Sequence, residues 1–236
     1  MALNVYVGSL TRYYAGGWES VTDRTGRERR WKAEAGQPRA AGVPKKDHER
    51  IQASVLTWRR TLDSALAPHL TEPLSWNESP EAPWFTDWMG WDGFGSLVLW
   101  AAYAEQPTLS RPAVLPRDWD DDAALVRSNA DGFHSRFSHL VRNVELWLPT
   151  TLDFTFEAED VDGRRVIVGS STTLRCQLAE LNAATWKMDE DEMSALARGR
   201  PEGDPSFEVS ARQAMAVLSG LAGQAVKHRL PMKLDY

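Results

Sequence analysis

Hydrophobic residues follow two different periods along this chain, and each period predicts a different kind of element. At the start, Leu3, Val5 and Val7 alternate with polar or small residues, which is typical of a half-buried β-strand. Between Ile51 and Leu66, apolar residues recur every three or four positions and stop before Pro68, which predicts an amphipathic helix. The chain is therefore expected to combine strands with helices.

The middle of the chain is predicted to be a long loop followed by helices. Residues 67–92 are rich in proline, acids and tryptophan, which favours a loop. Residues 93–104 are apolar nearly all round, so a helix there would be buried on most sides. Another helix is expected to start at the DWDDD sequence, residues 118–122. The core face of the next predicted helix consists of Phe133, Phe137, Leu140, Val141 and Val144.

Strand periodicity returns after residue 150. Leu152, Phe154 and Phe156 alternate with polar residues, and Val166 and Val168 alternate again after the DVDG sequence. Two alternating runs separated by turn residues predict a β-hairpin near residues 152–169.

Two helices and a strand are predicted for the rest of the chain. Ser170 or Ser171 can cap the first helix, which carries a stripe of leucines. Asp204 and Pro205 suit the cap and first turn of a last long helix, whose end is marked by basic residues. The tail LPMKLDY alternates apolar and polar positions, so the chain is expected to close with a short strand.

Together these elements predict a single α+β domain over residues 1–236. About six helices would pack on a small, mostly antiparallel sheet that includes the hairpin near 152–169. The N-terminal and C-terminal strands are expected to join the hairpin in that sheet. With 236 residues, the chain is long enough to bury a sizeable core.

One segment, about 22–50, differs from the rest in charge. From Asp23 to Arg50 there are nine Lys/Arg against five Asp/Glu, a balance of +4, while the whole chain carries −6. The remainder therefore carries −10. Because this segment has few large apolar residues and several glycines and prolines, we expect it to be mobile or extended.

Composition sets several classes of protein aside. A net charge of −6 argues against nucleic-acid binding, which needs a basic surface. The single cysteine, Cys176, excludes an internal disulfide and a multi-cysteine zinc site. The longest apolar run, Leu97 to Ala104, is far too short to span a membrane, and the N-terminus does not resemble a secretory signal. A cytoplasmic protein without membrane contact is expected.

Motifs that carry enzyme chemistry are missing. The sequence contains no P-loop, zinc-protease, nucleophile-elbow or C-x-x-C pattern, and GWDGFG at 90–95 lacks the third glycine of a dinucleotide loop. DWDDD could hold a divalent cation, but acids at the start of a helix are favoured by its dipole without any metal. We therefore expect no cofactor and no metal, and assign no catalytic residue.

Tryptophan is the unusual feature. Five of the eleven tryptophans lie within 25 residues, among glycines, prolines and acids: Trp76, Trp84, Trp88, Trp91 and Trp100. Such a loop could be a sugar-stacking cleft with paired carboxylates, or a protein-binding surface with aromatic anchors. Alternatively, the loop folds back over the sheet and buries its indoles.

A second aromatic and polar patch, SLTRYYAGGW, follows the first strand. If it lies near the 84–92 loop, Arg12 would face Asp87 or Asp92 as a structural ion pair or as part of an anion site. The candidate binding residues are Arg12, Tyr14, Trp18, Trp84, Asp87, Trp88, Trp91 and Asp92.

Three stretches of the chain resemble an uncharacterised family of bacterial hypothetical proteins: LNVYVGSLTRYY at the start, ESPEAPWFTD in the middle and HRLPMKLDY at the end. The resemblance implies a bacterial cytosolic setting and carries no activity, cofactor or catalytic residue. Small acidic bacterial proteins of this fold class without catalytic motifs are often immunity or antitoxin-like binders, which is an analogy between classes.

Two functions are compatible with these features. The leading hypothesis is a non-enzymatic protein-binding module, immunity or antitoxin-like, whose acidic tryptophan-rich surface engages a basic partner protein. The alternative is an enzyme or receptor for a small polar or carbohydrate ligand, bound between the Arg12–Trp18 patch and the 84–92 loop, with residues 23–50 as a lid.

Overall fold

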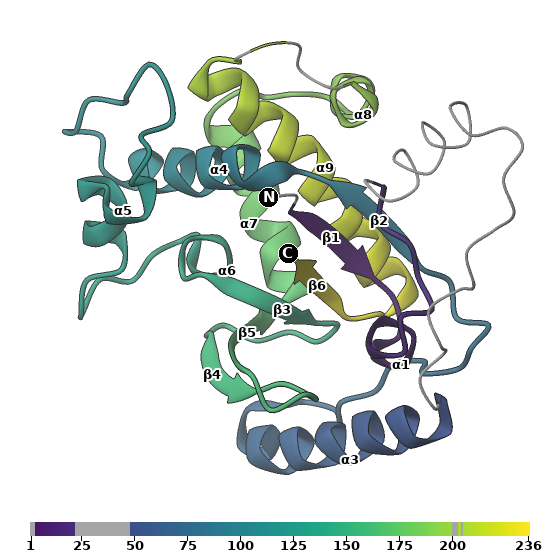
Figure 1. Cartoon of the computed structure of the whole chain (residues 1–236). Coiled ribbons are helices and arrows are strands. Elements are labelled where there is room, and N and C mark those ends of the chain that lie inside the picture. Colours follow the sequence, from purple (N-terminus) through teal and green to yellow (C-terminus); the bar gives the residue numbers. More distant parts are fainter. Residues whose placement is uncertain (1–2, 22–47, 200–202, 204) are drawn as a thin grey trace, which may run out of the picture.

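A six-stranded mixed sheet runs through the middle of the protein (Figure 1). The computed structural model describes residues 3–21, 48–199, 203 and 205–236. The strands lie in the order β2-β1-β6-β3-β5-β4, and of their five pairings only β3 with β5 is parallel. Their bounds are β1 Asn4–Val7, β2 Phe85–Trp88, β3 Val144–Leu148, β4 Phe156–Glu159, β5 Arg165–Ser170 and β6 Met232–Asp235.

Eight α-helices are present in the described part of the chain, against about six predicted. They are α1 Leu10–Tyr14, α3 His48–Leu66, α4 Gly90–Glu105, α5 Ala123–Ser128, α6 Ser138–Val141, α7 Ser171–Ala184, α8 Glu190–Arg198 and α9 Phe207–His228. Single 3-10 turns, η1 and η2, lie at Ala67–His69 and Trp119–Asp121. The α+β class and the mostly antiparallel sheet are confirmed.

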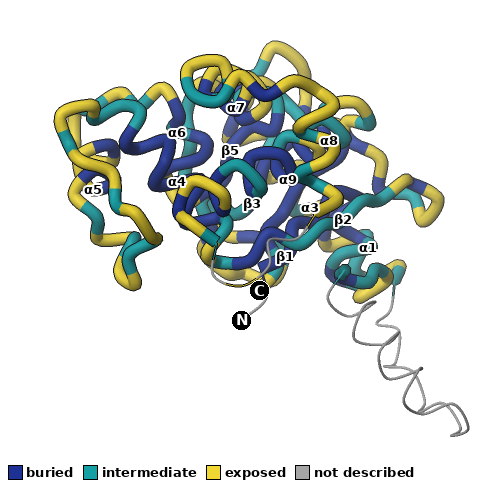
Figure 2. The backbone as a smooth tube through the Cα atoms, turned by 90° about the horizontal axis from the view of Figure 1, so that it is seen from above, coloured by how far each residue is buried: buried dark blue, intermediate teal, exposed yellow. Residues whose placement is uncertain are grey.

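Helices cover both faces of the sheet, as the alternation of its strands requires. Val5 and Val7 of β1 point into the larger core, together with residues of α4, α7 and α9. On the opposite face, Leu146 and Leu148 of β3 pack with residues of α1 and α3. Figure 1 shows α3 on one side of the sheet and α4, α7 and α9 on the other, and Figure 2 shows long buried stretches in α4 and α9.

A register irregularity in β3 places Val144 and Leu146, which are two residues apart, in different cores. The register between β3 and β5 shifts between Val144 and Leu146. A bulge of this kind reverses the face to which the following side chains point. Val144 therefore belongs to the larger core, whereas Leu146 and Leu148 belong to the core beneath α3.

The predicted terminal strands and the hairpin meet as expected. β1 pairs with β6, and β6 pairs with β3, which joins the β4–β5 hairpin. The hairpin begins at Phe156, so the predicted range was four residues too long at its start. The cap of α7 is Ser170, whose hydroxyl accepts the Thr173 N–H, as predicted.

Three predicted elements differ in the structure. Residues 85–88 form an edge strand rather than part of a loop, because β1 offers a partner that a local pattern cannot reveal. The helix predicted with a core face from Phe133 to Val144 is reduced to the single turn α6, because residues 133–137 are not helical and Asn143 adopts a left-handed conformation (φ 52°) before the chain continues as a strand. The last helix is capped by Ser206, whose hydroxyl accepts the Val209 N–H.

The predicted mobile segment lies mostly outside the described residues, which omit 22–47. Its last three residues, 48–50, form the first turn of α3, so this helix starts earlier than its apolar stripe indicates. Asp204, predicted as a cap, also lies outside them. None of the described helices combines the length and the apolar character needed to cross a lipid bilayer.

Candidate interaction groove

The predicted site residues separate into several environments, and Arg12 belongs to a structural one. Its guanidinium donates to the carbonyl oxygen of Ala82 (2.7 Å) and to that of Pro80. No ion pair joins it to Asp87 or Asp92 within the described residues. Arg12 therefore fastens the 80–82 loop to α1 instead of facing the acids of the 84–92 region.

The same loop carries a carboxylate that completes the start of α1. Buried Glu78 accepts the main-chain N–H groups of Leu10 (3.1 Å) and Thr11 (2.7 Å), which have no partner within a helix. The Trp76 indole N–H donates to this carboxylate as well. Glu78 thus holds α1 and residues 76–82 together.

Tyr14 belongs to a buried polar network that we call the Asp160 network. Its hydroxyl donates to Asp160 Oδ2 (3.0 Å), which also faces Lys233 Nζ at 3.3 Å. The other carboxylate oxygen accepts the main-chain N–H groups of Asp162 and Arg164, both at 3.0 Å. Lys233 is only 2% exposed, and this burial lowers the pKa of its ammonium while Asp160 opposes the effect.

The Asp160 network joins three distant segments. Its members come from α1, from the turn between β4 and β5, and from β6. Because each carboxylate oxygen already accepts hydrogen bonds, Asp160 is suited to holding these segments together rather than to binding a ligand. The role of Tyr14 is therefore structural.

Trp18 is half-buried and packs among tyrosines. Its ring stacks on Tyr13 with centroids 5.6 Å apart and lies 4.9 Å from that of Tyr6. Tyr13 in turn donates its hydroxyl to Asp235 Oδ1 at 2.9 Å. The aromatic patch predicted after β1 thus forms a cluster against the sheet.

The β2 residues lie at the end of the sheet. Trp84, Asp87 and Trp88 are partly exposed. Asp87 Oδ1 accepts the main-chain N–H of Trp88 at 2.7 Å. Phe85 contacts His228 at the end of α9, with ring centroids 5.2 Å apart, so its side of β2 faces that helix.

Trp91 and Asp92 lie in the first turn of α4 and line a cavity of about 680 Å³. The opposite lining comes from the segment before α5 and from the start of α9. We call this cavity the Trp91–Trp119 groove. It is lined by Trp91, Asp92, Val114, Leu115, Pro116, Arg117, Trp119, Pro205, Phe207 and Ser210.

Close packing on α4 positions the second tryptophan of the groove. A Cβ atom at Gly95 would lie 2.6 Å from Cε2 of Trp119, so only glycine allows this indole to approach the helix. The Phe207 N–H donates to the Ala113 carbonyl at 3.3 Å, which ties α9 to the same segment. The Trp91 ring rests on Tyr236, with centroids 5.2 Å apart.

The groove has an apolar lining and an acidic surround. Val114, which lines the groove, is 66% exposed. Asp92 follows Trp91, while Asp118 and Asp120 flank Trp119, and all three carboxylates are exposed. Arg117 is the one basic residue in the lining. The indole N–H of Trp91 is buried and has no hydrogen-bond partner among the described residues.

The acids of DWDDD have separate roles. Asp122 caps α5 by accepting the Ala124 N–H (2.8 Å) and also receives the Tyr103 hydroxyl (3.1 Å). A helix does follow this motif, but it starts only at Ala123, after the 3-10 turn η2. Across the described ranges, no cluster of three or more His, Cys, Asp or Glu is placed to hold a metal ion.

Sequence reasoning missed Trp119, Arg117 and Phe207 as groove residues. The available signal was the repeated placement of an acid beside a tryptophan, at Trp91-Asp92 and again at Asp118-Trp119-Asp120. No local pattern indicates that the segment around Trp119 packs against the start of α4, where Trp91 lies.

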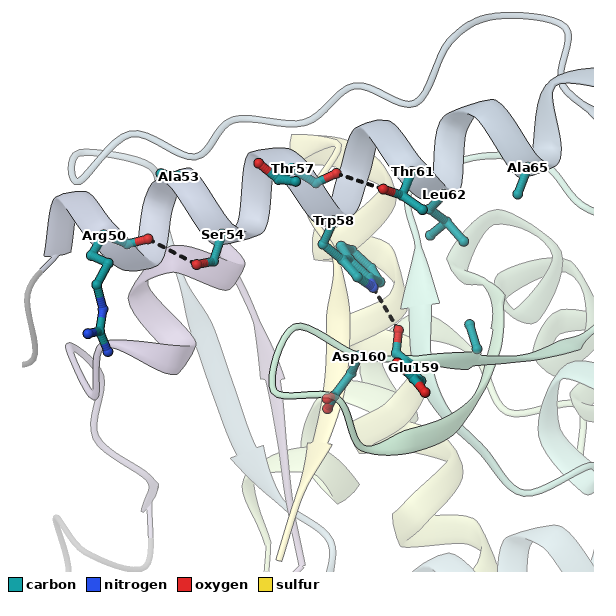
Figure 3. Close-up of a pocket in the computed structure, with 11 residues that line it drawn as sticks. Arg50, Ala53, Ser54, Thr57, Trp58, Thr61, Leu62, Ala65, Glu159 and Asp160 are labelled. Carbon is teal, nitrogen blue, oxygen red and sulfur yellow. Dashed lines mark hydrogen bonds between the residues drawn. The ribbon is translucent and has the colours of Figure 1, made fainter.

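A second cavity, of about 760 Å³, lies between α3 and the β4–β5 hairpin (Figure 3). The Trp58 indole N–H donates to the Glu159 carbonyl across it, at 2.7 Å. The hydroxyls of Ser54 and Thr61 donate to carbonyls of their own helix. The polar groups of Trp58, Ser54 and Thr61 are therefore engaged by the protein itself.

His139 is the most strongly buried histidine, but its contacts are structural. Its Nδ1 accepts the Ser170 N–H at 2.9 Å, which requires an unprotonated Nδ1. Burial lowers the pKa of this imidazole to about 4. A neutral ring that accepts a main-chain hydrogen bond joins α6 to the end of β5.

Comparison with known proteins offers no template for this arrangement. No protein-family model, curated protein or solved structure matches the chain. A functional assignment therefore has to come from the geometry and chemistry of the groove.

Proposed function

We propose that this protein is a protein-binding module that engages a basic partner through the Trp91–Trp119 groove and its acidic surround. Such a protein would act as an immunity or antitoxin-like binder acts, by occupying a basic surface of another protein. Its setting would be the bacterial cytosol, and no catalytic step is involved.

The observation that carries the proposal is the pairing of exposed carboxylates with partly exposed indoles at one cavity. Tryptophan supplies a large anchoring surface at protein interfaces. In the two chain segments 91–92 and 117–120, which hold the tryptophans of the cavity, the exposed acids Asp92, Asp118 and Asp120 outnumber Arg117, which favours a positively charged partner.

The distribution of charge along the sequence also favours a basic partner. Between Arg60 and Arg111 the chain has seven Asp/Glu and no Lys or Arg. Four of these acids accept main-chain N–H groups of the protein itself: Asp63, Glu78, Asp87 and Glu105. Glu81 and Asp92 are exposed and add to the negative potential of the surface.

The small-ligand alternative has less support. It needs Arg12 beside Asp87 or Asp92, but the Arg12 guanidinium binds two main-chain carbonyls of the 80–82 loop. Asp92 lines the Trp91–Trp119 groove together with both tryptophans. The basic residue in that lining is Arg117, not Arg12.

The test is a tagged pull-down from bacterial cytosol at about 50 mM and about 500 mM salt. The captured protein is identified by mass spectrometry, purified and titrated directly against the chain. We expect a stoichiometric basic partner whose binding weakens at high salt and in Asp92→Lys. Asp131→Lys, which makes the same charge change at another exposed position, should bind normally.

Equal binding by Asp92→Lys and Asp131→Lys would place the interface elsewhere. Retention of the partner at high salt with full affinity would remove the electrostatic basis of the proposal.

A further inference from the structure

We infer that Asp131 is a site of spontaneous chemical modification, at which this aspartate converts to isoaspartate through a cyclic succinimide. The inference goes beyond the proposed function and is independent of it, because it concerns the chemistry of one turn and needs no partner. It rests on a comparison of the three places in the chain where a glycine follows an aspartate.

The reaction takes place between two neighbouring residues. The main-chain nitrogen of the second residue attacks Cγ of the aspartate, an N–Cγ bond forms, and the amide proton leaves with the carboxyl hydroxyl as water. Water then adds back to a ring carbonyl, and opening at the main-chain carbonyl leaves the chain connected through Cγ. A glycine in the second position favours the attack, because no Cβ atom stands beside its nitrogen.

The aspartate is exposed in each of the three pairs, so solvent reaches every one of the carboxylates. The residue types are also the same, and a difference in reactivity therefore has to come from the backbone. The three pairs are Asp92–Gly93, Asp131–Gly132 and Asp162–Gly163.

The backbone protects two of these pairs. Asp92 and Gly93 lie within α4, so the attack would require Asp92 to leave its helical conformation. The Gly163 N–H donates to the Asp160 carbonyl at 3.0 Å, and this bond has to break before the nitrogen can attack. The same turn is held further by the Asp160 carboxylate, which accepts the main-chain N–H groups on both sides of Gly163.

The third pair is not protected in this way. The turn at 130–133 is closed by the Phe133 N–H, which donates to the Ala130 carbonyl at 3.0 Å. Between these residues, neither the Gly132 N–H nor the Asp131 carboxylate has a hydrogen-bond or ion-pair partner in the part of the chain that the structure describes. His134 contacts the carbonyl of Gly132 (3.1 Å) and leaves its nitrogen free.

The space around Gly132 is also open. A Cβ atom added there would meet no atom within 4 Å, so no neighbouring side chain blocks the approach of the nitrogen to Cγ. Gly132 has a positive φ of 81°, a conformation that glycine adopts without strain. The tertiary structure therefore leaves Asp131–Gly132 as the reactive pair.

The test is storage of the full chain at neutral pH and elevated temperature for several weeks, followed by peptide mapping. Trypsin releases residues 128–136, in which Asp131 is the one acidic residue. Electron-transfer fragmentation distinguishes the two linkages at equal mass, and deamidation of Asn129 is recognised by its change in mass. We expect isoaspartate to accumulate severalfold faster at Asp131 than at Asp92 or Asp162. Equal rates at the three sites, or none at Asp131, would overturn the inference.

Two controls test the chemistry and the role of the fold. Asp131→Glu keeps the charge but has to close a larger ring, so isoaspartate should disappear from peptide 128–136; circular dichroism checks that this variant is folded. In concentrated urea the backbone protection is lost, and the three pairs should react at similar rates. The same preference for Asp131 in the unfolded chain would assign it to neighbouring residues in the sequence, and the structural basis of the inference would be wrong.

Discussion

Two regions of this protein combine aromatic rings with carboxylates, and their carboxylates have opposite surroundings. Asp160 is buried beneath α1 and accepts from Tyr14, Lys233 and two main-chain N–H groups. Asp92 is exposed in the first turn of α4, where it lines the Trp91–Trp119 groove. An acid beside an aromatic residue therefore has no fixed role. The donors that the tertiary structure brings to the carboxylate decide whether it is structural or available.

Removing the Asp160 charge should have the largest effect. Asp160→Asn keeps the shape but leaves the buried Lys233 ammonium without its carboxylate, so we expect a loss of about 3–5 kcal/mol in the free energy of unfolding. Urea unfolding followed by tryptophan fluorescence measures it. The matched change Asp92→Asn should cost less than about 1 kcal/mol, mainly through the helix dipole.

A second substitution checks the cause of that loss. Adding Lys233→Met to Asp160→Asn removes the unpaired ammonium and should restore part of the stability. If the double variant is no more stable than Asp160→Asn, the loss does not come from a buried unpaired charge. Similar losses in Asp160→Asn and Asp92→Asn would show that the buried and the exposed carboxylate do not differ in their contribution to stability.

Lowering the pH tests the role of another buried polar group, His139. Its pKa in the folded protein, about 4, lies below the ordinary value of 6.5, so folding favours the neutral ring. The contribution is complete above about pH 6.5 and is lost as the pH falls toward 4, by about 3 kcal/mol in total. Unfolding free energies across this range measure the loss.

His139→Asn is the control for this pH dependence. It keeps an acceptor near the Ser170 N–H but has no proton to gain, so its stability should be lower at neutral pH and should fall less on acidification. An unchanged slope in this variant would assign the acid sensitivity to other groups.

The smallest expected effects come from two helical glycines with opposite surroundings. Gly95→Ala should cost about 1–3 kcal/mol, because the added methyl group meets Trp119 and displaces a wall of the groove. Gly220→Ala in α9 meets nothing within 4 Å and should stabilise the protein by up to about 1 kcal/mol. Thermal unfolding of both variants measures the difference in sign.

The groove prediction depends on the same pair. Partner binding should weaken in Gly95→Ala and persist in Gly220→Ala, since only the first glycine positions Trp119. Normal binding by a folded Gly95→Ala protein would show that Trp119 does not form a wall of the binding site.

The parts of the fold with strong local patterns were predictable. The strand near Leu3, the stripe of α3 and the hairpin follow from periods of two or about 3.6, which reflect the geometry of a single element, and α4 follows from its continuous apolar run. β2 was missed because four residues beside Pro83 are stabilised mainly by pairing with β1. The helix predicted with a core face from Phe133 to Val144 was mostly wrong: only Ser138–Val141 is helical, and the left-handed Asn143 ends it.

The candidate site was predictable only in part. Trp91 and Asp92 were expected to contribute and do line a cavity, whereas Arg12, Tyr14 and Trp18 belong to other contacts. The tryptophan and acid content predicted an aromatic, acidic surface. It did not predict that Trp91 and Trp119 line the same cavity. Phe207, some 115 positions away in the sequence, enters the groove only because α9 lies against α4.

Local patterns in the amino-acid sequence account for the fold class, the terminal strands, the hairpin and the excess of acid around the tryptophans. These properties depend on local periodicity and composition, which neighbouring residues specify. Only the tertiary structure decided that Asp160 is enclosed by donors and that Asp92 stays exposed beside Trp91, facing the segment that holds Trp119. The physical reason is that hydrogen-bond partners and burial come from segments far apart in the chain, and no local pattern encodes their meeting.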